Sequence, residues 1–154
     1  MIIYIASDHR GFNLKESLKK YLADSGYTVN DMGNTSLVPD DDYPDFASLV
    51  AEKVSLNAEN SKGIVICGSG VGVDIVANKF PRVRCSLVMT SDQAYVARSD
   101  DDPNIIALAA EFVDDVTAKA VLATWLQTPF SGDTRCLRRL AKIREVEEKA
   151  KTLD

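Results

Sequence analysis

The sequence predicts an α/β fold, a Rossmann-like three-layer sandwich in which helices cover both faces of a five-stranded parallel sheet. Short runs rich in Ile and Val alternate along the chain with segments whose apolar residues recur at helical spacing, which is the pattern of parallel strands joined by crossover helices. Residues 63–67 read GIVIC, a continuously apolar run expected of a strand buried on both faces. A glycine-rich turn then leads into a helical segment.

Each predicted element has its own local signal. Leu14, Leu18 and Leu22 recur at helical spacing after the first strand, and Gly26 ends that helix. Pro44 stands where the first turn of a helix accepts proline. The predicted strands are residues 2–6, 27–30, 63–67, 85–89 and 105–109, and further helices are predicted from the glycine turn to 79, over 92–99 and over 114–127. Because parallel sheets bind ligands at the carboxyl ends of their strands, the loops after strands one, three, four and five are the predicted site.

Composition limits the class of protein. A length of 154 residues with 45% hydrophobic content predicts a single domain over residues 1–154. The net charge of −5 argues against binding nucleic acid over a broad surface, and no apolar stretch approaches the ~20 residues that span a membrane. Three widely spaced cysteines without a CxxC pair argue against a disulfide framework and against a zinc site. A cytoplasmic protein without bound metal is therefore expected.

The strongest chemical signal is the run ICGSGVG at residues 66–72. Cys67 ends a buried strand, and the glycines and Ser69 after it expose backbone N–H groups at a helix start, where an anion or a developing oxyanion is held. The same helix start would lower the pKa of the Cys67 thiol, and a thiolate there can remove a proton from a carbon beside a carbonyl. The alternative is that Cys67 is a small core residue. The spacing matches neither a dinucleotide-binding fingerprint nor a Walker loop.

Two further polar runs fall at the same predicted edge of the sheet. Asp8 and His9 directly follow the first strand, and the alternative to a functional pair is an aspartate that caps the next helix beside a solvated histidine. Residues 40–42 are three aspartates in front of Tyr43 and Pro44. As a charge run they are interpreted as a solvated helix start, with Tyr43 able to project into the cleft.

The end of the chain is basic, with seven Lys or Arg against three Glu in residues 135–151. Arg135, Arg139 and Lys142 fall at i, i+4 and i+7 on one helix face. That face is either solvated or captures phosphate, whose oxygens match the guanidinium fork. The same helix carries apolar side chains that need a partner, namely Leu137, Leu140 and Ile143. We therefore expect a homodimer, or a tetramer of paired dimers, with this helix packed on the partner.

Together these motifs resemble those of the type B ribose-5-phosphate isomerase and galactose-6-phosphate isomerase family over essentially the whole chain. The matching runs are SDHRGF at 7–12, DDYPDFA at 41–47, ICGSGVG with ANK at 66–79, Pro103-Asn104, and FSGDTRCLRRLAKI at 130–143. The glycine loop with its preceding cysteine is the specific one. The resemblance implies an aldose–ketose isomerase that interconverts ribose 5-phosphate and ribulose 5-phosphate through an enediolate, with neither metal nor cofactor.

The resemblance also implies roles for individual residues. Cys67 would be the base that moves a proton between C1 and C2, and Ser69 with the amides of residues 70–72 would hold the enediolate oxygens. Asp100 stands at the position that assists ring opening. The expected substrate contacts are Asp8, His9, Tyr43, Gly68, Gly70, Val71, Gly72 and Asp101, together with Arg135 and Arg139, which would bind phosphate in the neighbouring subunit's site because the C-terminal helix extends to the dimer partner.

Three positions depart from the family pattern. Asp100 and Cys136 stand where the family has histidines, and Glu111 stands where it has an arginine that helps to bind phosphate. Two carboxylates that face the ligand would oppose a phosphate dianion, whereas a Glu111 that turns away to pair with Arg98 or Arg135 would leave the phosphate site intact. The sequence favours weakened activity on ribose 5-phosphate. It also allows a related isomerase for another sugar, phosphorylated or not, or a catalytically impaired sugar-binding homologue.

Overall fold

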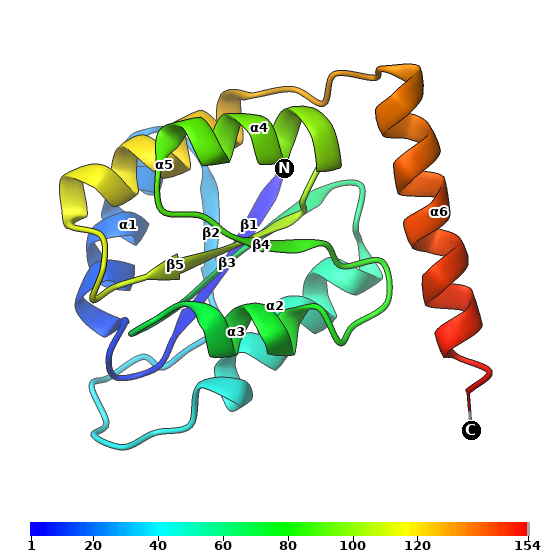
Figure 1. Cartoon of the computed structure of the whole chain (residues 1–154). Helices are drawn as coiled ribbons and strands as arrows, with labels where there is room; N and C mark the ends of the chain where they lie inside the picture. Colours follow the sequence, from blue (N-terminus) through cyan, green and yellow to red (C-terminus); the bar gives the residue numbers. More distant parts are fainter. Residues whose placement is uncertain (154) are drawn as a thin grey trace.

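The computed structural model describes residues 1–153 and contains one five-stranded sheet whose paired strands are all parallel (Figure 1). The strand order is β2-β1-β3-β5-β4. β3 lies at the centre, covered on both faces and paired on both edges, which explains its continuous apolar run. The predicted α/β class and parallel sheet are confirmed. The strands are β1 (Ile2–Ser7), β2 (Thr28–Asp31), β3 (Ser61–Cys67), β4 (Cys85–Leu87) and β5 (Ile105–Ala109).

Helices cover both faces of this sheet. Successive side chains of β3 point to opposite faces. Ile64 and Ile66 pack against residues of α1, α4 and α5 on one face, where Trp125 is fully buried. Val65 and Cys67 pack against α2 and α3 on the other face. The layers are therefore helix, sheet and helix, as predicted. The helices are α1 (Phe12–Asp24), α2 (Tyr43–Leu56), α3 (Val71–Ala77), α4 (Ser91–Asp101), α5 (Asp115–Gln127) and α6 (Thr134–Ala150).

Element ends differ from the predicted ones by a few residues, for local reasons. β4 stops at Leu87 rather than at residue 89, and it is an edge strand that pairs with β5 alone. α4 continues to Asp101 and ends there because Asp102, with a φ of 46°, leaves the right-handed helical region. β3 begins two residues early at Ser61, whose hydroxyl donates to the carbonyl of Asn57 after α2.

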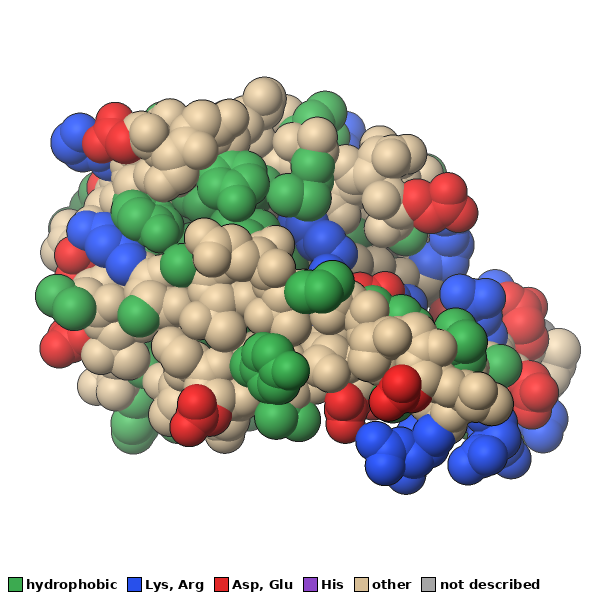
Figure 2. All heavy atoms as spheres, turned by 90° about the horizontal axis from the view of Figure 1, so that it is seen from above, with side chains coloured by type: hydrophobic (Ala, Val, Ile, Leu, Met, Phe, Trp, Pro, Cys, Tyr) green, Lys and Arg blue, Asp and Glu red, His purple; other side chains and the backbone are tan. Residues whose placement is uncertain are grey.

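The helix α6 stands beside the sandwich, near the end of the sheet where the strands begin (Figure 1). Cys136 and Leu140 are its buried residues, and the amide of Arg82 donates to the Glu147 carboxylate at 3.0 Å. Leu137 remains 53% exposed. Lys and Arg side chains gather at this end of the molecule (Figure 2). Nowhere in residues 1–153 does a helix have the length and apolar character needed to cross a membrane.

Candidate active site

The carboxyl edge of the sheet brings together the loops that follow β1, β3 and β5. The amide of Asp8 donates to the Ile66 carbonyl at 3.3 Å, which joins the first loop to the end of β3. The amides of Ala110 and Glu111 donate to the carbonyls of Cys67 and Gly68 at 2.9 and 3.0 Å. Backbone hydrogen bonds therefore fix the three loops against one another, as expected for a site at the end of a parallel sheet.

Cys67 is the last residue of β3 and is 4% exposed. The amide of Gly70 donates to its sulfur at 3.1 Å. Gly70 has a φ of 73°, and a Cβ at this position would lie 3.1 Å from the Leu108 backbone, so the turn requires glycine. The Cys67 sulfur thus has a backbone hydrogen-bond donor beside the start of α3. Cys67 is thus a buried core residue, and its thiol also lies beside the glycine loop with a backbone donor on its sulfur.

The rest of the glycine loop carries Ser69 and lies under an aromatic ring. The amide of Val71, at the start of α3, faces the Ser69 hydroxyl at 3.4 Å. A Cβ on Gly72 would lie 2.5 Å from the ring of Tyr43, so this glycine lets the first residue of α2 lie directly over the loop. The structure therefore brings Tyr43 to the glycine loop, as the sequence predicts.

Asp8 and His9 reach the same edge, with different partners. Asp8 is buried, and its carboxylate accepts the Gly11 amide at 2.9 Å. Asp8 therefore bonds the residue in front of α1, whereas no side chain caps the first turn of that helix. Burial raises the pKa of Asp8, and the hydrogen bond from Gly11 opposes that rise. His9 lies one residue further out and is bonded to Asp41.

Asp41 is a site residue that the sequence interpretation missed. It accepts the His9 amide at 2.7 Å and lies 2.8 Å from His9 Nδ1, with the same oxygen. That hydrogen bond raises the pKa of His9. Burial opposes ionisation of Asp41, but the hydrogen bonds from His9 prevail and lower the pKa of Asp41. The aspartates at 40–42 were predicted to be a solvated helix start, and this is wrong for Asp41 because the loop folds back over β1. The one available signal was that the DDYPDFA run begins at this residue.

Glu111 pairs with Arg10, a residue that the sequence interpretation did not single out. Arg10 Nε donates to Glu111 Oε1 at 2.6 Å, and Nη2 bonds the second oxygen. This fork holds the pKa of Glu111 below its ordinary value. The guanidinium lies directly on Gly68, where a Cβ would collide with it. An arginine in contact with the glycine loop supplies positive charge beside Cys67.

Glu111 is paired, but with neither of the partners that the sequence offered as one alternative, Arg98 and Arg135. Glu111 follows the carboxyl end of β5, whereas Arg98 lies on α4 near the start of that strand. Arg98 instead forms an ion pair with Asp102 and donates to the carbonyls of Trp125 and Pro103 at 3.1 and 3.0 Å. Arg10, the partner of Glu111, therefore lies at the carboxyl edge of the sheet, whereas Arg98 lies at the amino edge.

Four predicted site residues lie away from Cys67 within one chain. Asp100 and Asp101 end α4, which leads into the amino end of β5. Arg135 and Arg139 are on α6, which lines a cavity with Lys62 and Arg84 at the amino ends of β3 and β4. A strand of seven residues such as β3 is roughly 20 Å long. The structure thus has two clusters at opposite edges of the sheet. Within residues 1–153, no three His, Cys, Asp or Glu side chains are arranged to hold a metal ion.

Comparison with known proteins matches this chain over nearly its full length. The family model described as Ribose/Galactose Isomerase matches residues 3–143. A probable ribose-5-phosphate isomerase B from Mycoplasma genitalium is 40% identical over 146 residues, which are 95% of each chain. The ribose-5-phosphate isomerase B of Escherichia coli (strain K12) is 35% identical over 96% of this chain and 97% of its own.

Solved structures agree with the sequence comparison. The crystal structure of ribose-5-phosphate isomerase B from Mycoplasma genitalium with bound ribulose-5-phosphate superposes with a TM-score of 0.93 at 40% identity, and the alignment covers 96% of both chains. The ribose-5-phosphate isomerase B of Clostridium thermocellum gives a TM-score of 0.92 at 41% identity, over 97% of this chain and 99% of the other. Because the family match includes the glycine loop around Cys67 and both fold and sequence agree, this chain belongs to the ribose/galactose isomerase family.

Proposed function

We propose that this protein interconverts ribose 5-phosphate and ribulose 5-phosphate through an enediolate, with Cys67 as the base. The observation that carries the proposal is the contact between Cys67 Sγ and the Gly70 amide at the end of the central strand. It places a hydrogen-bond donor on the sulfur of Cys67, in a loop with further backbone donors, within a family whose named members are isomerases of this kind. An aldose–ketose isomerase needs this combination of a base and an oxyanion site.

The chemistry moves one proton between neighbouring carbons. In the open-chain aldose, the C1 carbonyl acidifies the C2–H bond, and the Cys67 thiolate takes that proton. The enediolate that forms places charge on O1 and O2, beside Ser69 and the amides of Val71 and Gly72. Return of the proton to C1 gives the ketose. The Gly70 amide is engaged with Sγ, so it stabilises the base rather than the enediolate.

The phosphate end of the substrate needs cations, and one chain supplies only part of them near Cys67. Arg10 lies on the glycine loop, whereas Arg135 and Arg139 are on α6 at the opposite edge of the sheet. We propose a homodimer in which α6 of one subunit brings these two arginines to the Cys67 site of the other. Asp100 and Asp101, at the same edge as α6, would enter the partner's site with them.

The surface around α6 supports this assembly. A groove of about 840 Å³ runs between α6 and the sandwich. Apolar side chains line it from both sides, including Phe80, Pro81, Val83, Ile143 and Val146. An apolar groove beside exposed apolar helix residues is typical of a surface buried between subunits. All three cysteines are unpaired, which fits the reducing cytoplasm that we propose as the location.

A second candidate is isomerisation of a different aldose phosphate by the same steps. It is favoured by Asp100 and Glu111, which place carboxylates where the family pattern has a histidine and an arginine. The two candidates share the Cys67 chemistry and differ in the sugar.

A substrate panel in deuterated water tests both. Ribose 5-phosphate, galactose 6-phosphate and free ribose are each incubated with the protein, and proton loss at C2 is followed by NMR. We expect the highest kcat/KM for ribose 5-phosphate and little exchange in free ribose. Faster exchange in another aldose phosphate would favour the second candidate, and no exchange in any substrate would contradict both.

A further inference from the structure

His9 is the only histidine in the chain. It is therefore the only side chain whose ordinary pKa lies near neutrality. His9 belongs to the loop after β1, which the Asp8 amide ties to the end of β3 one residue before Cys67. Its side chain is 29% exposed, so a small molecule can contact it.

Asp41 fixes the orientation of the His9 ring. One carboxylate oxygen lies 2.7 Å from the His9 amide and 2.8 Å from Nδ1. With Nδ1 committed to the carboxylate, Nε2 is the nitrogen left for substrate, and no hydrogen bond to Nε2 is formed within residues 1–153. The carboxylate of Asp41 is largely buried, at 8% exposure. A histidine held in this way by an acid is oriented for proton transfer through its second nitrogen.

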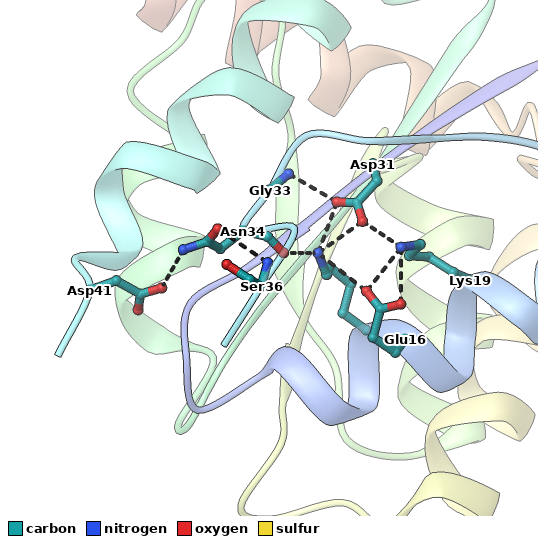
Figure 3. Close-up of polar contacts among 8 residues, drawn as sticks. Glu16, Lys19, Asp31, Gly33, Asn34, Ser36 and Asp41 are labelled. Atoms are coloured by element: carbon teal, nitrogen blue, oxygen red, sulfur yellow. Dashed lines mark hydrogen bonds and ion pairs between the residues drawn. The ribbon is translucent and has the colours of Figure 1, made fainter. Parts of the chain in front are cut away.

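Asp41 is itself supported by the loop that follows β2. The Asn34 side-chain amide donates to the second oxygen of Asp41 at 3.4 Å (Figure 3). On its other side, the Asn34 carbonyl accepts the ammonium group of Lys15, which is fully buried and also bonds Asp31 at 2.9 Å. Figure 3 shows this ionic cluster on one side of Asn34 and Asp41 on the other. The loop that carries Asn34 is thus anchored to α1 and β2.

We propose that His9 is the catalytic residue that opens the furanose ring of the substrate, and that Asp41, supported by Asn34, is its positioning residue. The inference deepens the proposed function and rests on it. It assigns the step that must precede proton removal at C2, since only the open-chain aldehyde has the carbonyl that acidifies this position. Asp100, which stands at the expected ring-opening position, has a carboxylate in place of an imidazole.

The step moves one proton from O1 to O4. Nε2–H of the protonated imidazole donates to the ring oxygen O4 as the C1–O4 bond breaks. The O1–H bond electrons become the second bond of the C1 carbonyl, and the O1 proton returns to Nε2. No other reactant is consumed. The charged groups that face His9 are Asp8, Asp41 and Glu111, the last of these paired with Arg10.

A comparison of two substrates separates ring opening from the later removal of the C2 proton. Ribose 5-phosphate closes a furanose through O4, whereas erythrose 4-phosphate carries its phosphate on O4 and cannot form that ring. Exchange of the C2 proton in deuterated water is measured for both with the wild type, Asp41→Asn and His9→Gln. Asp40→Asn, which removes the same charge from the neighbouring exposed residue, is the matched control. Cys67→Ala should abolish exchange in both substrates.

We expect Asp41→Asn and His9→Gln to slow exchange of the C2 proton in ribose 5-phosphate by ~10- to 100-fold. The exchange rate in erythrose 4-phosphate should stay within about threefold of the wild-type rate. Exchange in ribose 5-phosphate should then stop rising with enzyme concentration, because spontaneous ring opening limits it. Since Asp41 favours the charged imidazole, Asp41→Asn should also move the alkaline limb of the ribose 5-phosphate profile to lower pH. His9→Gln keeps the inference testable if Asp41→Asn does not fold.

Other outcomes would overturn the inference. An equal loss on both substrates would make His9 a binding residue for phosphate or for the open chain. No loss on either would remove it from the reaction. A wild type that exchanges erythrose 4-phosphate but not ribose 5-phosphate would preserve the Cys67 chemistry and exclude ring opening by His9. A wild type inactive on both would contradict the proposed function itself.

Discussion

At the scale of single residues, the glycine loop at the carboxyl edge of the sheet follows Cys67 and contacts the guanidinium of Arg10, which is paired with Glu111. The Arg10–Glu111 pair changes the electrostatics that the sequence suggests. Glu111 does not face the substrate as an isolated charge, because both its oxygens are bonded to Arg10. The net charge that the pair presents to a phosphate is close to zero.

This pairing predicts unequal effects of removing its two members. Glu111→Gln should lower KM for ribose 5-phosphate, by up to about threefold, because it leaves the Arg10 guanidinium without its carboxylate partner. Arg10→Gln should raise KM by ~tenfold or more, because it leaves Glu111 uncompensated near the phosphate. Steady-state kinetics at low and high salt measure both, and screening should reduce the second effect. Equal effects of the two variants would contradict the assignment of Arg10 as a substrate-facing cation.

The three thiols should differ in reactivity. Burial raises the pKa of Cys85 well above its ordinary value, with Asp74 adding to that rise, and Cys136 is fully buried. The sulfur of Cys67 instead accepts the Gly70 amide at 3.1 Å, at the turn that begins α3. We expect iodoacetamide to modify Cys67 at least ~tenfold faster than Cys85 at neutral pH, as read by peptide mass spectrometry, with ribulose 5-phosphate slowing the reaction. Preferential labelling of Cys85 would show that the glycine loop does not activate its cysteine.

Sequence patterns predicted the residues that lie on regular elements better than those on loops. Cys67 ends a strand whose apolar run and glycine turn are legible in the sequence. Asp41 and Arg10 act through contacts with residues 32 and 101 positions away. Such contacts depend on how loops fold back over the sheet, and hydrophobic periodicity carries no information about that.

At the scale of elements, α1 and β2 form a support for the loop that carries Asn34. Lys15 of α1 is fully buried, and its ammonium group bonds both oxygens of Asp31 and the Asn34 carbonyl. Lys19 and Glu16 complete the cluster at the surface (Figure 3). Burial opposes ionisation of Asp31, but the hydrogen bonds from Lys19 and Lys15 prevail and lower the pKa of Asp31.

Loss of the buried lysine should therefore affect stability and its pH dependence. Lys15→Met should lower the free energy of unfolding by about 3 kcal/mol, because it leaves Asp31 with one cation fewer in a partly buried site. A carboxylate with a lowered pKa stabilises the fold above its ordinary pKa, and this contribution is lost as pH falls through the lowered value. The variant should accordingly lose stability at a higher pH than the wild type. Urea unfolding between pH 3 and 7, values spanning the ordinary carboxyl range, measures both effects.

The matched control is Lys20→Met, which removes an exposed lysine paired with Asp24 on the same helix. Exposed pairs contribute little, so its unfolding curve should follow the wild type. Similar curves for both variants and the wild type would show that the cluster around Lys15 does not support the fold.

Elements themselves were predictable because each has a strong local cause. β5 was predicted with its observed bounds and β3 within two residues, since continuous apolar runs mark them, and α2 begins one residue before the proline that was predicted to lie in its first turn. The extension of α4 to Asp101 was missed because a left-handed Asp102 ends it where glycine would be the usual signal.

At the scale of the whole molecule, the two edges of the sheet carry the two groups of residues that the proposed dimer would combine in one site. The thiol, His9 and Tyr43 lie at the carboxyl edge, while Arg135 and Arg139 lie on α6 at the amino edge. In a symmetric dimer each site would take one half from each subunit. Apolar residues of α6 indicated a partner from the sequence alone, but the separation of the two clusters required the structure.

Subunit mixing tests this arrangement. Cys67→Ala and the double variant Arg135→Ala/Arg139→Ala should each be nearly inactive. Random exchange of subunits makes half of the dimers mixed, and each mixed dimer contains one site with both halves intact. Isomerase activity should therefore recover to about a quarter of the wild-type value. Mixing Arg135→Ala with Arg139→Ala, which damage the same half, should restore nothing. Absence of recovery in confirmed mixed dimers would contradict a shared site, as would a stable monomer with full activity.

The most direct measurement is exchange of the C2 proton of ribose 5-phosphate in deuterated water by the wild type and by Cys67→Ala. If Cys67 is the base of the isomerisation, the wild type should incorporate deuterium as it forms ribulose 5-phosphate, and the folded variant should lose both reactions by at least ~100-fold. A Cys67→Ala protein that still exchanges and isomerises at close to the wild-type rate would show that the base lies elsewhere at this edge of the sheet.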